Sequence, residues 1–466
     1  MSENKYNLIV IGGGPGGYVA AIRASQLGMR VALVEKEQLG GVCLNWGCIP
    51  TKALLRSAEI HHLLKAASAF GLRVSDMGVD WSAVVARSRQ VAGQLSKGVA
   101  HLLKKNRVEI IPGHGAFQSA NSISVSRDGA ETVTLSADHI IVATGARARD
   151  LPGIAAGSDR IWNYRQAMIA TALPSSLLVV GSGAIGIEFA SLFAEFGVAV
   201  SVAEMADRIL PNEDTEVSAY AKAQFEKRGI RFLTEAKVTS MEETATSVEA
   251  VIDTGTGASR ESFDCALIAV GVVANSDSLA LEKVGVELKN TSIVINEWGQ
   301  TCVPSIWAIG DVAGGPWLAH KASHEAVATV EHIAGHPAAH PINRANIPGC
   351  TYSFPQIASI GLTEQQALAA NCKIRKGNFP FMGNGKALAL GDADGFIKTV
   401  VDDDTGEILG AHMVGAEVTE LIHSFVLARE LEATEDEVGM TMFPHPTLSE
   451  ALHESVLSAA GKALHI

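Results

Sequence analysis

The chain contains 466 residues, 47% of them hydrophobic, which predicts two to four domains with large cores. Its formal net charge of −13 argues against binding to nucleic acid or to an anionic membrane, because both are negatively charged. Six cysteines in a chain of this length do not make the framework of a small secreted disulfide-rich protein.

The N-terminal segment predicts a dinucleotide-binding unit. An apolar strand at 7–11 leads into a glycine turn, a helix at 18–27 and a second strand at 30–34 that ends at Glu35. The glycines of the dinucleotide fingerprint are Gly12, Gly14 and Gly17. They allow the turn, the approach of a pyrophosphate to the backbone and tight helix packing, while Glu35 can accept hydrogen bonds from ribose. Because this strand begins so early, no signal or transit peptide is expected and the predicted location is cytoplasmic.

The next segment, GGVCLNWGCIPTKALL, contains the neighbouring cysteines Cys43 and Cys48. In a straight helix, residues five apart are separated by about 7.5 Å of rise and point about 140° apart, whereas a disulfide needs Cα atoms within about 7 Å. A bond would therefore require a bend, which Gly47 and Pro50 permit before a helix expected after Pro50. A strained disulfide is readily reduced. Lys52 lies one helical turn after Cys48, so its positive charge would favour the thiolate form of Cys48. The segment indicates a redox dithiol, and two buried free thiols are the alternative that spacing alone leaves open.

Two segments connect this region to the next unit. Residues 138–145, DHIIVATG, predict a strand that ends in a tight turn at Thr144 and Gly145. Residues 166–187 carry no charge, but Pro174 and several glycines and serines indicate a loop, a strand and a turn rather than a membrane span.

The dinucleotide-binding unit then recurs. The landmarks Gly181, Gly183, Gly186, Gly197 and Glu204 each lie 169 residues after their counterparts Gly12, Gly14, Gly17, Gly28 and Glu35. Five coincident landmarks predict a second dinucleotide-binding domain. Glu204 at the ribose position would repel a 2′-phosphate, which favours NAD over NADP, and Arg208 is expected to be a surface charge.

The following segments predict the end of the second unit and a return to the first. Residues 266–271 form a strand that ends at Gly271, and 306–311 form a short strand that ends at Gly310 and Asp311. A long helix is expected to open within 315–322. Its two histidines, His320 and His324, are expected to be solvated or capping residues rather than metal ligands, and no metal is predicted.

The C-terminal part predicts an α+β domain. A segment at 336–348 rich in proline, alanine and histidine is interpreted as a link between domains. Strands are expected at 352–362 and 396–411, with a hairpin turn at 402–406, and helices from about 419 and 448.

The segment FPHPTLSE carries a candidate acid–base pair. His445 stands between two prolines, which hold it extended and exposed, and Glu450 follows five residues later. A carboxylate that orients an imidazole makes it a better base for a thiol. The spacing of Thr447 and Glu450 also fits a helix capping box, which alone would explain the glutamate.

Over nearly its whole length the sequence resembles the flavin disulfide reductases, and among them most closely the dihydrolipoamide dehydrogenases of the class I pyridine nucleotide-disulfide oxidoreductases. The resemblance implies an α/β fold with two Rossmann-like dinucleotide-binding domains, for FAD and NAD, and a C-terminal α+β dimerisation domain. The expected domains are an FAD domain at 1–146, an NAD domain at 147–274, a central segment at 275–345 that completes the FAD domain, and an interface domain at 346–466.

The resemblance also implies roles for individual residues. Cys48 would lie against the flavin as a charge-transfer thiolate, Cys43 would exchange with the substrate sulfurs, and His445, oriented by Glu450, would serve the disulfide of the neighbouring subunit. Glu188 would lie near the nicotinamide and pair with Lys52. The remaining residues expected at the cofactors are Gly12, Gly14, Gly17, Glu35, Gly115, Thr144, Gly145, Gly310, Asp311 and Ala319 for FAD, and Gly181, Gly183, Gly186, Glu204 and Gly271 for NAD.

The implied function is oxidation of dihydrolipoyl groups by NAD through FAD and the redox disulfide. The implied partners are a second copy of the chain, in a homodimer, and the lipoyl domain of an acyltransferase or a glycine-cleavage carrier protein. Glutathione-type reductases are disfavoured by Glu204, mercuric reductases by the absence of a C-terminal cysteine pair, and an inert structural flavoprotein by the presence of all five catalytic residues. The family often has Gly-Arg-x-Pro-Asn where this chain has Gly271-Val272-Val273-Ala274-Asn275, which leaves the details of that crossover open.

Overall fold

The computed structural model describes residues 5–127 and 132–466, which form two compact units. Unit 1 contains the described residues of Met1–Ala53, Ser82–Arg149 and Gly271–Ile342. Unit 2 contains Leu54–Trp81, Asp150–Val270 and Asn343–Ile466. Each unit therefore draws on three separate stretches of the chain.

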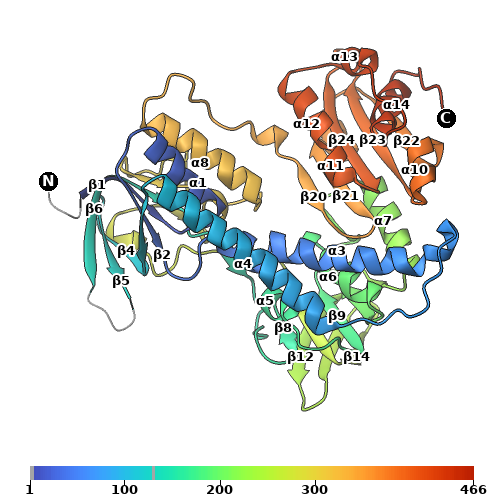
Figure 1. Ribbon diagram of the computed structural model, residues 1–466, viewed down its shortest axis with the longest axis horizontal. Helices are drawn as coiled ribbons and strands as arrows, with labels where there is room; N and C mark the ends of the chain where they lie inside the picture. The colour runs from blue at the N-terminus through green and yellow to red at the C-terminus, as the bar shows by residue number, and fades with distance from the viewer. Residues whose placement is uncertain (1–4, 128–131) are drawn as a thin grey trace. The chain divides into compact units, whose positions relative to one another are not determined.

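Unit 1 is built around a seven-stranded sheet in the order β3-β2-β1-β6-β5-β4, with β19 also paired to β6 (Figure 1). Its strands are β1 (Lys5–Ile11), β2 (Val31–Glu35), β3 (Glu109–Pro112), β4 (His114–Ser119), β5 (Ser122–Ser126), β6 (Val133–Val142) and β19 (Ile306–Ala308). The pairs among β3, β2, β1, β6 and β19 are parallel, and β4 and β5 add an antiparallel edge. Parallel strands of this kind are covered on both faces, which explains their nearly continuous apolar sequence.

Alternate residues of β1 enter two different cores. Leu8 and Val10 pack with helices α1 (Pro15–Gln26), α4 (Trp81–Lys105) and α8 (Ala319–Ile333) on one face. Ile9 and Ile11 pack on the other face with residues of β4, β5 and the segment after Ala274. In Figure 1, α1 and α8 run side by side over the sheet.

Short elements complete unit 1. They are α2 (Gly41–Trp46), the start of α3 (Cys48–Lys65), η3 (Gly310–Ala313), the antiparallel pair β7 (Ala146–Ala148) and β16 (Val272–Ala274), the pair β17 (Leu288–Lys289) and β18 (Ser292–Ile293), and η2 (Leu281–Lys283).

Unit 2 contains a parallel five-stranded sheet in the order β11-β10-β9-β15-β8 and an antiparallel sheet of β12, β13 and β14. These strands are β8 (Ile161–Trp162), β9 (Ser176–Val180), β10 (Ala199–Ala203), β11 (Arg231–Leu233), β12 (Lys237–Glu243), β13 (Val248–Asp253), β14 (Ala258–Phe263) and β15 (Cys265–Ile268). Its helices here are η1 (Ala67–Phe70), α5 (Tyr164–Met168), α6 (Ala184–Glu195) and α7 (Thr215–Lys227).

The C-terminal part of unit 2 is an antiparallel sheet in the order β20-β21-β24-β23-β22, with helices packed on it (Figure 1). The strands are β20 (Gly349–Thr351), β21 (Gln356–Gly361), β22 (Ile374–Pro380), β23 (Gly395–Asp402) and β24 (Ile408–Gly415). The helices are η4 (Arg344–Asn346), α9 (Glu364–Ala369), η5 (Phe381–Gly383), α10 (Gly385–Leu390), α11 (Val418–Leu421), α12 (His423–Glu430), α13 (Glu435–Met440) and α14 (Glu450–Ala459).

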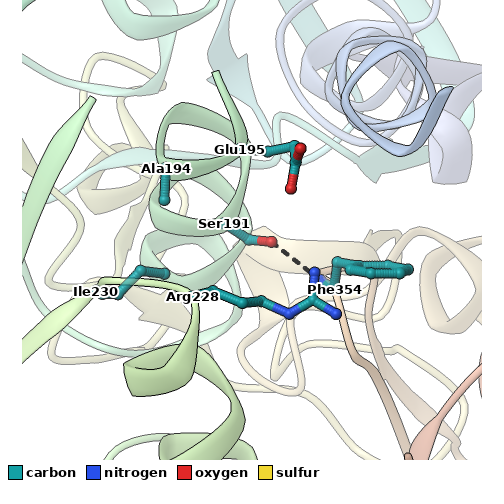
Figure 2. A pocket seen from close by; sticks show the side chains of 6 residues that line it. All are labelled: Ser191, Ala194, Glu195, Arg228, Ile230 and Phe354. Atoms are coloured by element: carbon teal, nitrogen blue, oxygen red, sulfur yellow. Dashed lines mark hydrogen bonds between the residues drawn. The ribbon is translucent and has the colours of Figure 1, made fainter. Parts of the chain in front are cut away.

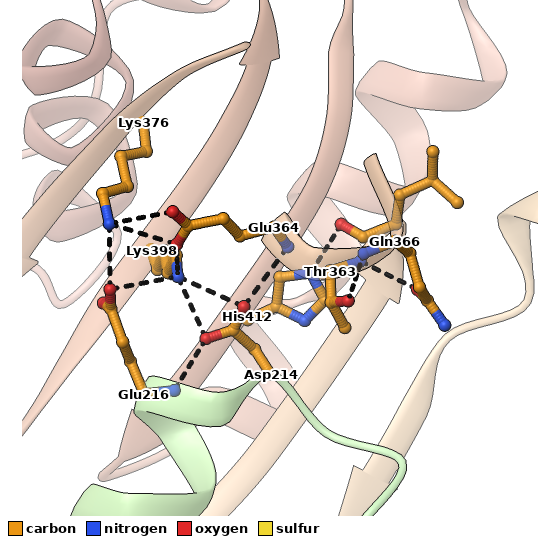
Figure 3. A network of polar contacts seen from close by, with 9 residues as sticks. Asp214, Glu216, Thr363, Glu364, Gln366, Lys376, Lys398 and His412 are labelled. Carbon is orange, nitrogen blue, oxygen red and sulfur yellow. Dashed lines mark hydrogen bonds and ion pairs between the residues drawn. The ribbon is translucent and has the colours of Figure 1, made fainter. Parts of the chain in front are cut away.

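A buried ionic network joins α7 to this C-terminal sheet within unit 2 (Figure 3). The carboxylate of Asp214 caps α7 by accepting from the N–H of Glu216, and Nζ of Lys398 lies 3.0 and 3.2 Å from its two oxygens. Both side chains are 0% exposed. Lys398 also binds Glu364 at 2.5 Å, and Lys376 binds Glu216 and Glu364 at 3.0 and 3.1 Å. Neither buried charge is therefore left unpaired.

The predicted α/β architecture with a C-terminal α+β part is confirmed, with local differences. The helix predicted after Pro50 begins at Cys48 instead, and the uncharged segment 166–187 also contributes the start of α6. The predicted strand at 352–362 is shorter, and the hairpin turn lies between β23 and β24 as predicted.

Candidate active site

The two glycine turns adopt the same structure. Gly12 has φ +106° and Gly181 has φ +100°, a region that favours glycine. A Cβ on Gly12 would lie 2.3 Å from the carbonyl oxygen of Ala143, and one on Gly181 would lie 2.6 Å from that of Ala269. A side chain is therefore excluded at both turns, because it would collide with the backbone at Ala143 or Ala269.

The third fingerprint glycines are equally constrained. A Cβ on Gly17 would lie 1.8 Å from the carbonyl oxygen of Gly12, and one on Gly186 would lie 2.0 Å from that of Gly181. The two helices that follow, α1 and α6, also begin and end 169 residues apart. The repeat predicted from the sequence is thus confirmed in backbone geometry as well as in spacing.

The acidic residues that end β2 and follow β10 make matching hydrogen bonds. Glu35 accepts from the N–H of Gly13 at 2.6 Å and of Glu37 at 2.7 Å. Glu204 accepts from the N–H of Ser182 and of Ala206, both at 2.8 Å. Each carboxylate is held beside its glycine turn, where it can accept from a ribose hydroxyl.

Both turns fit a pyrophosphate. Gly14 and Gly183 are the N-caps of α1 and α6, and neither helix start has a side-chain cap, so the first-turn amides are available to an anion. Gly41 packs against Gly14, where a Cβ on Gly41 would lie 2.7 Å from the Gly14 Cα. On β4, a Cβ on Gly115 would lie 3.3 Å from Ile11.

Cys43 and Cys48 lie on either side of a helix break in unit 1. Cys43 belongs to α2 and Cys48 begins α3, and Gly47 between them has φ −145° and ψ −117°, far from helical values. This break allows the two thiols to form a hydrogen bond, which a continuous helix would prevent.

The electrostatic surroundings of Cys43 act in opposite directions. Its hydrogen bond with Cys48, burial and a charge on Cys48 raise the pKa of the Cys43 thiol, so the two thiols do not ionise together. Lys52 lowers this pKa and Asp311 raises it. The influence of Lys52 on the Cys48 thiol, which the spacing predicts, stays a prediction.

A buried ion pair that the sequence reasoning missed holds the turn at Gly310. Nζ of Lys321 lies 3.2 Å from Glu325 Oε1 and donates to the carbonyls of Gly310 and Gly314 at 3.2 and 2.7 Å. Glu325 Oε2 accepts from the N–H of Gly310 at 2.8 Å. Burial raises the pKa of Asp311 to about 6; Lys321 opposes this rise and Glu325 adds to it. The only sequence signal was a lysine and a glutamate four apart, a spacing that surface helices also show.

The chain connection that follows Gly271 is held by hydrogen bonds although the arginine and proline often found there in the family are missing. The Thr144 hydroxyl donates to the carbonyl of Asn275 at 2.7 Å, and the Asn275 amide donates back to the carbonyl of Thr144 at 3.0 Å. Arg147, on the paired strand β7, donates to Asn275 and Asp277. A Cβ on Gly145 or Gly271 would meet nothing within 4 Å, so the surface beside both is open.

His445 and Glu450 are paired at the start of α14. Nδ1 of His445 lies 2.9 Å from Glu450 Oε1, and the imidazole side chain is 78% exposed. Oε2 of Glu450 accepts from the N–H of Thr447 at 2.8 Å. The capping-box alternative is half correct, because the Thr447 hydroxyl donates to the carbonyl of Pro444 instead of capping α14, whose N-cap is Ser449.

The other predicted residues are distributed over the two units. Unit 1 holds Cys43, Cys48, Lys52, the first fingerprint, Gly310, Asp311 and Ala319, the first residue of α8. Unit 2 holds the second fingerprint, His445, Glu450 and Glu188, which is buried on α6 and accepts from the N–H of Tyr352 at 2.9 Å.

His320 and His324 are both exposed on α8. Within residues 5–127 and 132–466, no group of three or more histidine, cysteine, aspartate or glutamate side chains could hold a metal ion. In the same described ranges, no helix has the length and apolar character needed to cross a membrane.

A small cavity of about 20 Å³ in unit 2 is separate from the predicted site residues (Figure 2). Its lining residues are Ser191, Ala194, Glu195, Arg228, Ile230 and Phe354. Ser191 accepts from the N–H of Phe354 at 3.0 Å, and the Arg228 guanidinium stacks 4.0 Å from the centre of the Phe354 ring. This volume suits about one water molecule rather than a substrate.

Comparison with known proteins agrees with this geometry. Residues 6–326 match the family model described as pyridine nucleotide-disulphide oxidoreductase, and residues 347–456 match the dimerisation domain of that family. The chain is 54% identical to the dihydrolipoyl dehydrogenase of Zymomonas mobilis, with 99% of each chain covered. It is 44% identical to that of Bacillus subtilis, again with 99% of each covered.

Solved structures agree as well. LpdA from Mycobacterium tuberculosis superposes with a TM-score of 0.91 at 28% identity, covering 97% of this chain and 99% of that one. The HOCl-induced flavoprotein disulfide reductase RclA from Escherichia coli, as a Cu(II) complex, superposes with a TM-score of 0.88 at 26% identity and the same coverage. The chain belongs to the pyridine nucleotide-disulphide oxidoreductases.

Proposed function

We propose that the protein is an enzyme that oxidises dihydrolipoyl groups to lipoyl groups with NAD⁺ as the acceptor, through FAD and the Cys43–Cys48 pair. The observation that carries this proposal is the hydrogen-bonded pair of thiols across the helix break at Gly47, beside a glycine turn that fits a dinucleotide. The full-length similarity to dihydrolipoyl dehydrogenases supports the choice of substrate.

FAD would bind in unit 1 and NAD in unit 2. Gly12, Gly14 and Gly17 would admit the FAD pyrophosphate, and Glu35 would accept from its ribose. Gly181, Gly183, Gly186 and Glu204 would do the same for NAD. Gly115, Thr144, Gly145, Asp311 and Ala319 would complete the FAD site, and Glu188 would complete the NAD site of unit 2. Lys52 and Gly271 are the further cofactor residues that we propose in unit 1. The domain limits we propose are 1–146, 147–274, 275–345 and 346–466.

The thiol chemistry is an exchange between two disulfides. His445 Nε2 takes a proton from a dihydrolipoyl thiol, and the resulting thiolate attacks Cys43 of the Cys43–Cys48 disulfide, which releases Cys48 as a thiolate. The second substrate thiol loses its proton to solvent, and its thiolate then attacks the substrate sulfur of the mixed disulfide. This closes the lipoyl ring and releases Cys43, which receives a proton from His445. The FAD held by Gly12, Gly14, Gly17 and Glu35 would supply the two-electron chemistry that links the reduced pair to NAD⁺.

His445 is suited to act on a second copy of the chain. It lies in the segment that matches a dimerisation domain, its side chain is 78% exposed, and Glu450 fixes the ring through Nδ1, which leaves Nε2 for a thiol. The catalytic unit would therefore be a homodimer, with His445 of one copy serving Cys43 of the other. The macromolecular partner would be the lipoyl domain of an acyltransferase or a glycine-cleavage carrier protein.

Steady-state rates test the substrate and the acceptor. The purified protein should reduce NAD⁺ with dihydrolipoamide much faster than it reduces NADP⁺, and should show little activity with glutathione disulfide and either reduced nicotinamide. Addition of two electrons should give a long-wavelength charge-transfer absorption from the Cys48 thiolate. A protein that bleaches directly to reduced flavin, or that prefers glutathione disulfide, would contradict the proposal.

Mixed dimers test the exchange between subunits. A homodimer of Cys43→Ser should be inactive with dihydrolipoamide, and one of His445→Gln should be slower than wild type by about 10²- to 10⁴-fold. A mixed dimer of the two variants would have one site with both residues intact, and should recover about half of the wild-type turnover per dimer. No recovery in a verified mixed dimer would mean that His445 does not act across subunits.

A further inference from the structure

We propose that Lys398, on strand β23 of the C-terminal sheet, is a positioning residue for the second dinucleotide site, because it anchors the loop that holds the glycine turn at Ser182. The inference rests on the proposed binding of NAD in unit 2 and adds a residue outside the fingerprint to that site. Lys398 acts through other residues, since its ammonium donates to the carboxylates of Asp214 and Glu364. All of these residues belong to unit 2.

The loop at 205–213 connects Glu204, the proposed ribose acceptor, to helix α7. Within this loop, the N–H of Leu210 donates to the carbonyl oxygen of Ser182 at 3.1 Å. Ser182 in turn donates to Glu204 from its N–H at 2.8 Å and from its hydroxyl at 2.7 Å. The loop therefore holds both the glycine turn and the carboxylate beside it.

Unit 1 contains the same contact, which indicates that the contact belongs to the dinucleotide-binding unit. The N–H of Gly40 donates to the carbonyl oxygen of Gly13 at 2.8 Å, and the N–H of Gly13 donates to Glu35 at 2.6 Å. Gly13 and Ser182 are 169 residues apart, which is the offset of the whole repeat. The loop leads into α2 in unit 1 and into α7 in unit 2, so its anchor differs between the two sites.

The anchor in unit 2 extends from the first turn of α7 to Lys398. The buried Ser218 hydroxyl donates to the carbonyl oxygen of Ile209, the residue before Leu210, at 2.6 Å. The N–H of Ser218 donates to the carbonyl oxygen of Asp214 at 2.9 Å. Asp214 caps the same helix, and Nζ of Lys398 lies 3.0 and 3.2 Å from its two carboxylate oxygens. Hydrogen bonds, with one peptide bond between Ile209 and Leu210, thus connect Lys398 with the glycine turn.

Removal of the Lys398 charge would break this anchor. The carboxylates of Asp214, Glu216 and Glu364 lie 3.0, 3.4 and 2.5 Å from its Nζ, and Lys376 also binds the two glutamates (Figure 3). Without Lys398, the buried Asp214 carboxylate would lose its counter-ion and face two negative neighbours. It can regain hydration only if the start of α7 moves, and the loop before α7 would move with it. The network also stabilises unit 2, so a test has to separate NAD binding from folding.

The binding of ADP-ribose to the flavin-loaded protein tests the inference. ADP-ribose carries the pyrophosphate and riboses of NAD without the nicotinamide, so it cannot reduce the flavin, and bound FAD keeps the first site filled. Lys398→Met should raise the Kd for ADP-ribose, measured by calorimetry, about tenfold. The KM for NAD⁺ should rise by a similar factor, while kcat at saturating NAD⁺ and the flavin content stay close to wild type. An unchanged Kd for ADP-ribose in folded Lys398→Met would overturn the inference.

Two control variants separate positioning from charge and from stability. Lys376→Met removes the same charge, but Lys376 is about half exposed and binds Glu216 and Glu364, so this variant should change the Kd by less than about twofold. Ile397→Ala removes a buried side chain from the opposite face of β23, where it packs with α14, and should lower Tm without changing the Kd. If either control raises the Kd as much as Lys398→Met does, the inference is wrong.

Ser218→Ala tests the connection between Lys398 and the loop. This change removes the hydrogen bond to the Ile209 carbonyl and should also weaken ADP-ribose binding. The double variant Lys398→Met/Ser218→Ala should bind no more weakly than Lys398→Met, and fully additive losses would contradict a shared route.

If Lys398→Met does not fold, Asp214→Asn decides, because asparagine still caps α7 but carries no charge for Lys398 to hold. A raised Kd for ADP-ribose in this variant supports the inference, and an unchanged Kd overturns it. Failure of the proposed function itself is distinguishable, because the wild-type flavin-loaded protein would then not bind ADP-ribose.

Discussion

The imidazole of His445 is oriented by Glu450, with 2.9 Å between Nδ1 and Oε1. The second carboxylate oxygen of Glu450 is fixed by the N–H of Thr447. Burial raises the pKa of Glu450, but the hydrogen bonds from Thr447 and His445 outweigh it and hold this pKa below its ordinary value. The carboxylate therefore stays ionised at neutral pH and favours the tautomer with the proton on Nδ1.

The first prediction concerns this pair. His445→Gln should lower kcat with dihydrolipoamide by about 10²- to 10⁴-fold, because the general base is lost. Glu450→Gln should have a smaller effect, since its amide oxygen can still accept from Nδ1. The same helix offers a matched control, because Glu454 binds Nδ1 of His465 at 2.7 Å. Variants of His465 and Glu454 should keep near-normal kcat, and a near-normal rate in His445→Gln would discredit the assignment.

The second prediction concerns the dithiol. Cys43→Ser should abolish lipoamide turnover while flavin stays bound, because the sulfur that exchanges with substrate is gone. Cys302→Ser is the control, since Cys302 is an exposed thiol in another part of unit 1. Turnover and the ratio of flavin to protein absorbance measure both properties, and unchanged turnover in Cys43→Ser would refute its role.

The third prediction separates the two dinucleotide sites. Gly186→Ala would place a Cβ 2.0 Å from the Gly181 carbonyl oxygen and should abolish NADH binding, measured by calorimetry, while flavin is retained. Gly93→Ala on α4 is the control, because a Cβ there meets nothing within 4 Å. It should leave both sites intact and stabilise the helix by up to about 1 kcal/mol. Loss of flavin rather than NADH from Gly186→Ala would reverse the assignment of the two sites.

The fourth prediction concerns the ionic network of Figure 3. Lys398→Met would leave the buried carboxylate of Asp214 unpaired and should lower the free energy of unfolding by about 3–5 kcal/mol. Lys373→Met, which removes an exposed pair with Asp404, should change it by less than about 1 kcal/mol. Chemical denaturation measures both free energies of unfolding. Equal decreases in the two variants would show that burial does not increase the contribution of the Lys398–Asp214 pair to stability.

The fifth prediction is a pH dependence. Burial raises the pKa of Glu195, but hydrogen bonds from His62 and Lys65 outweigh it and lower this pKa to about 2. A carboxylate whose pKa is lower in the folded than in the unfolded protein stabilises the folded state above its ordinary pKa. This stabilisation is lost as the pH falls toward the pKa of the folded state. The difference in Tm between wild type and Glu195→Gln should be full at neutral pH and shrink from about pH 4.5 toward pH 2. A constant difference over that interval would contradict the lowered pKa.

The fold and much of the candidate site were predictable because their determinants are local. Gly12 and Gly181 are constrained by their own φ values and by neighbouring backbone, so the glycine spacing is visible in the sequence. His445 and Glu450 are five residues apart, and the prolines around the histidine restrict it directly. The predicted start of α3 was three residues too late, because a proline is tolerated in the first turn of a helix and Pro50 does not have to precede it.

Sequence alone therefore determined the duplicated glycine turns, the close spacing of Cys43 and Cys48, and the pairing of His445 with Glu450. Only the tertiary structure decided that Lys321 and Glu325 are buried against Gly310 while Lys222 and Glu226, with identical spacing, face solvent. It also decided that Lys398 meets Asp214, which lies 184 residues away in the sequence. The physical reason is that helical spacing fixes which side chains are neighbours, whereas packing of distant elements fixes which of those neighbours lose their water.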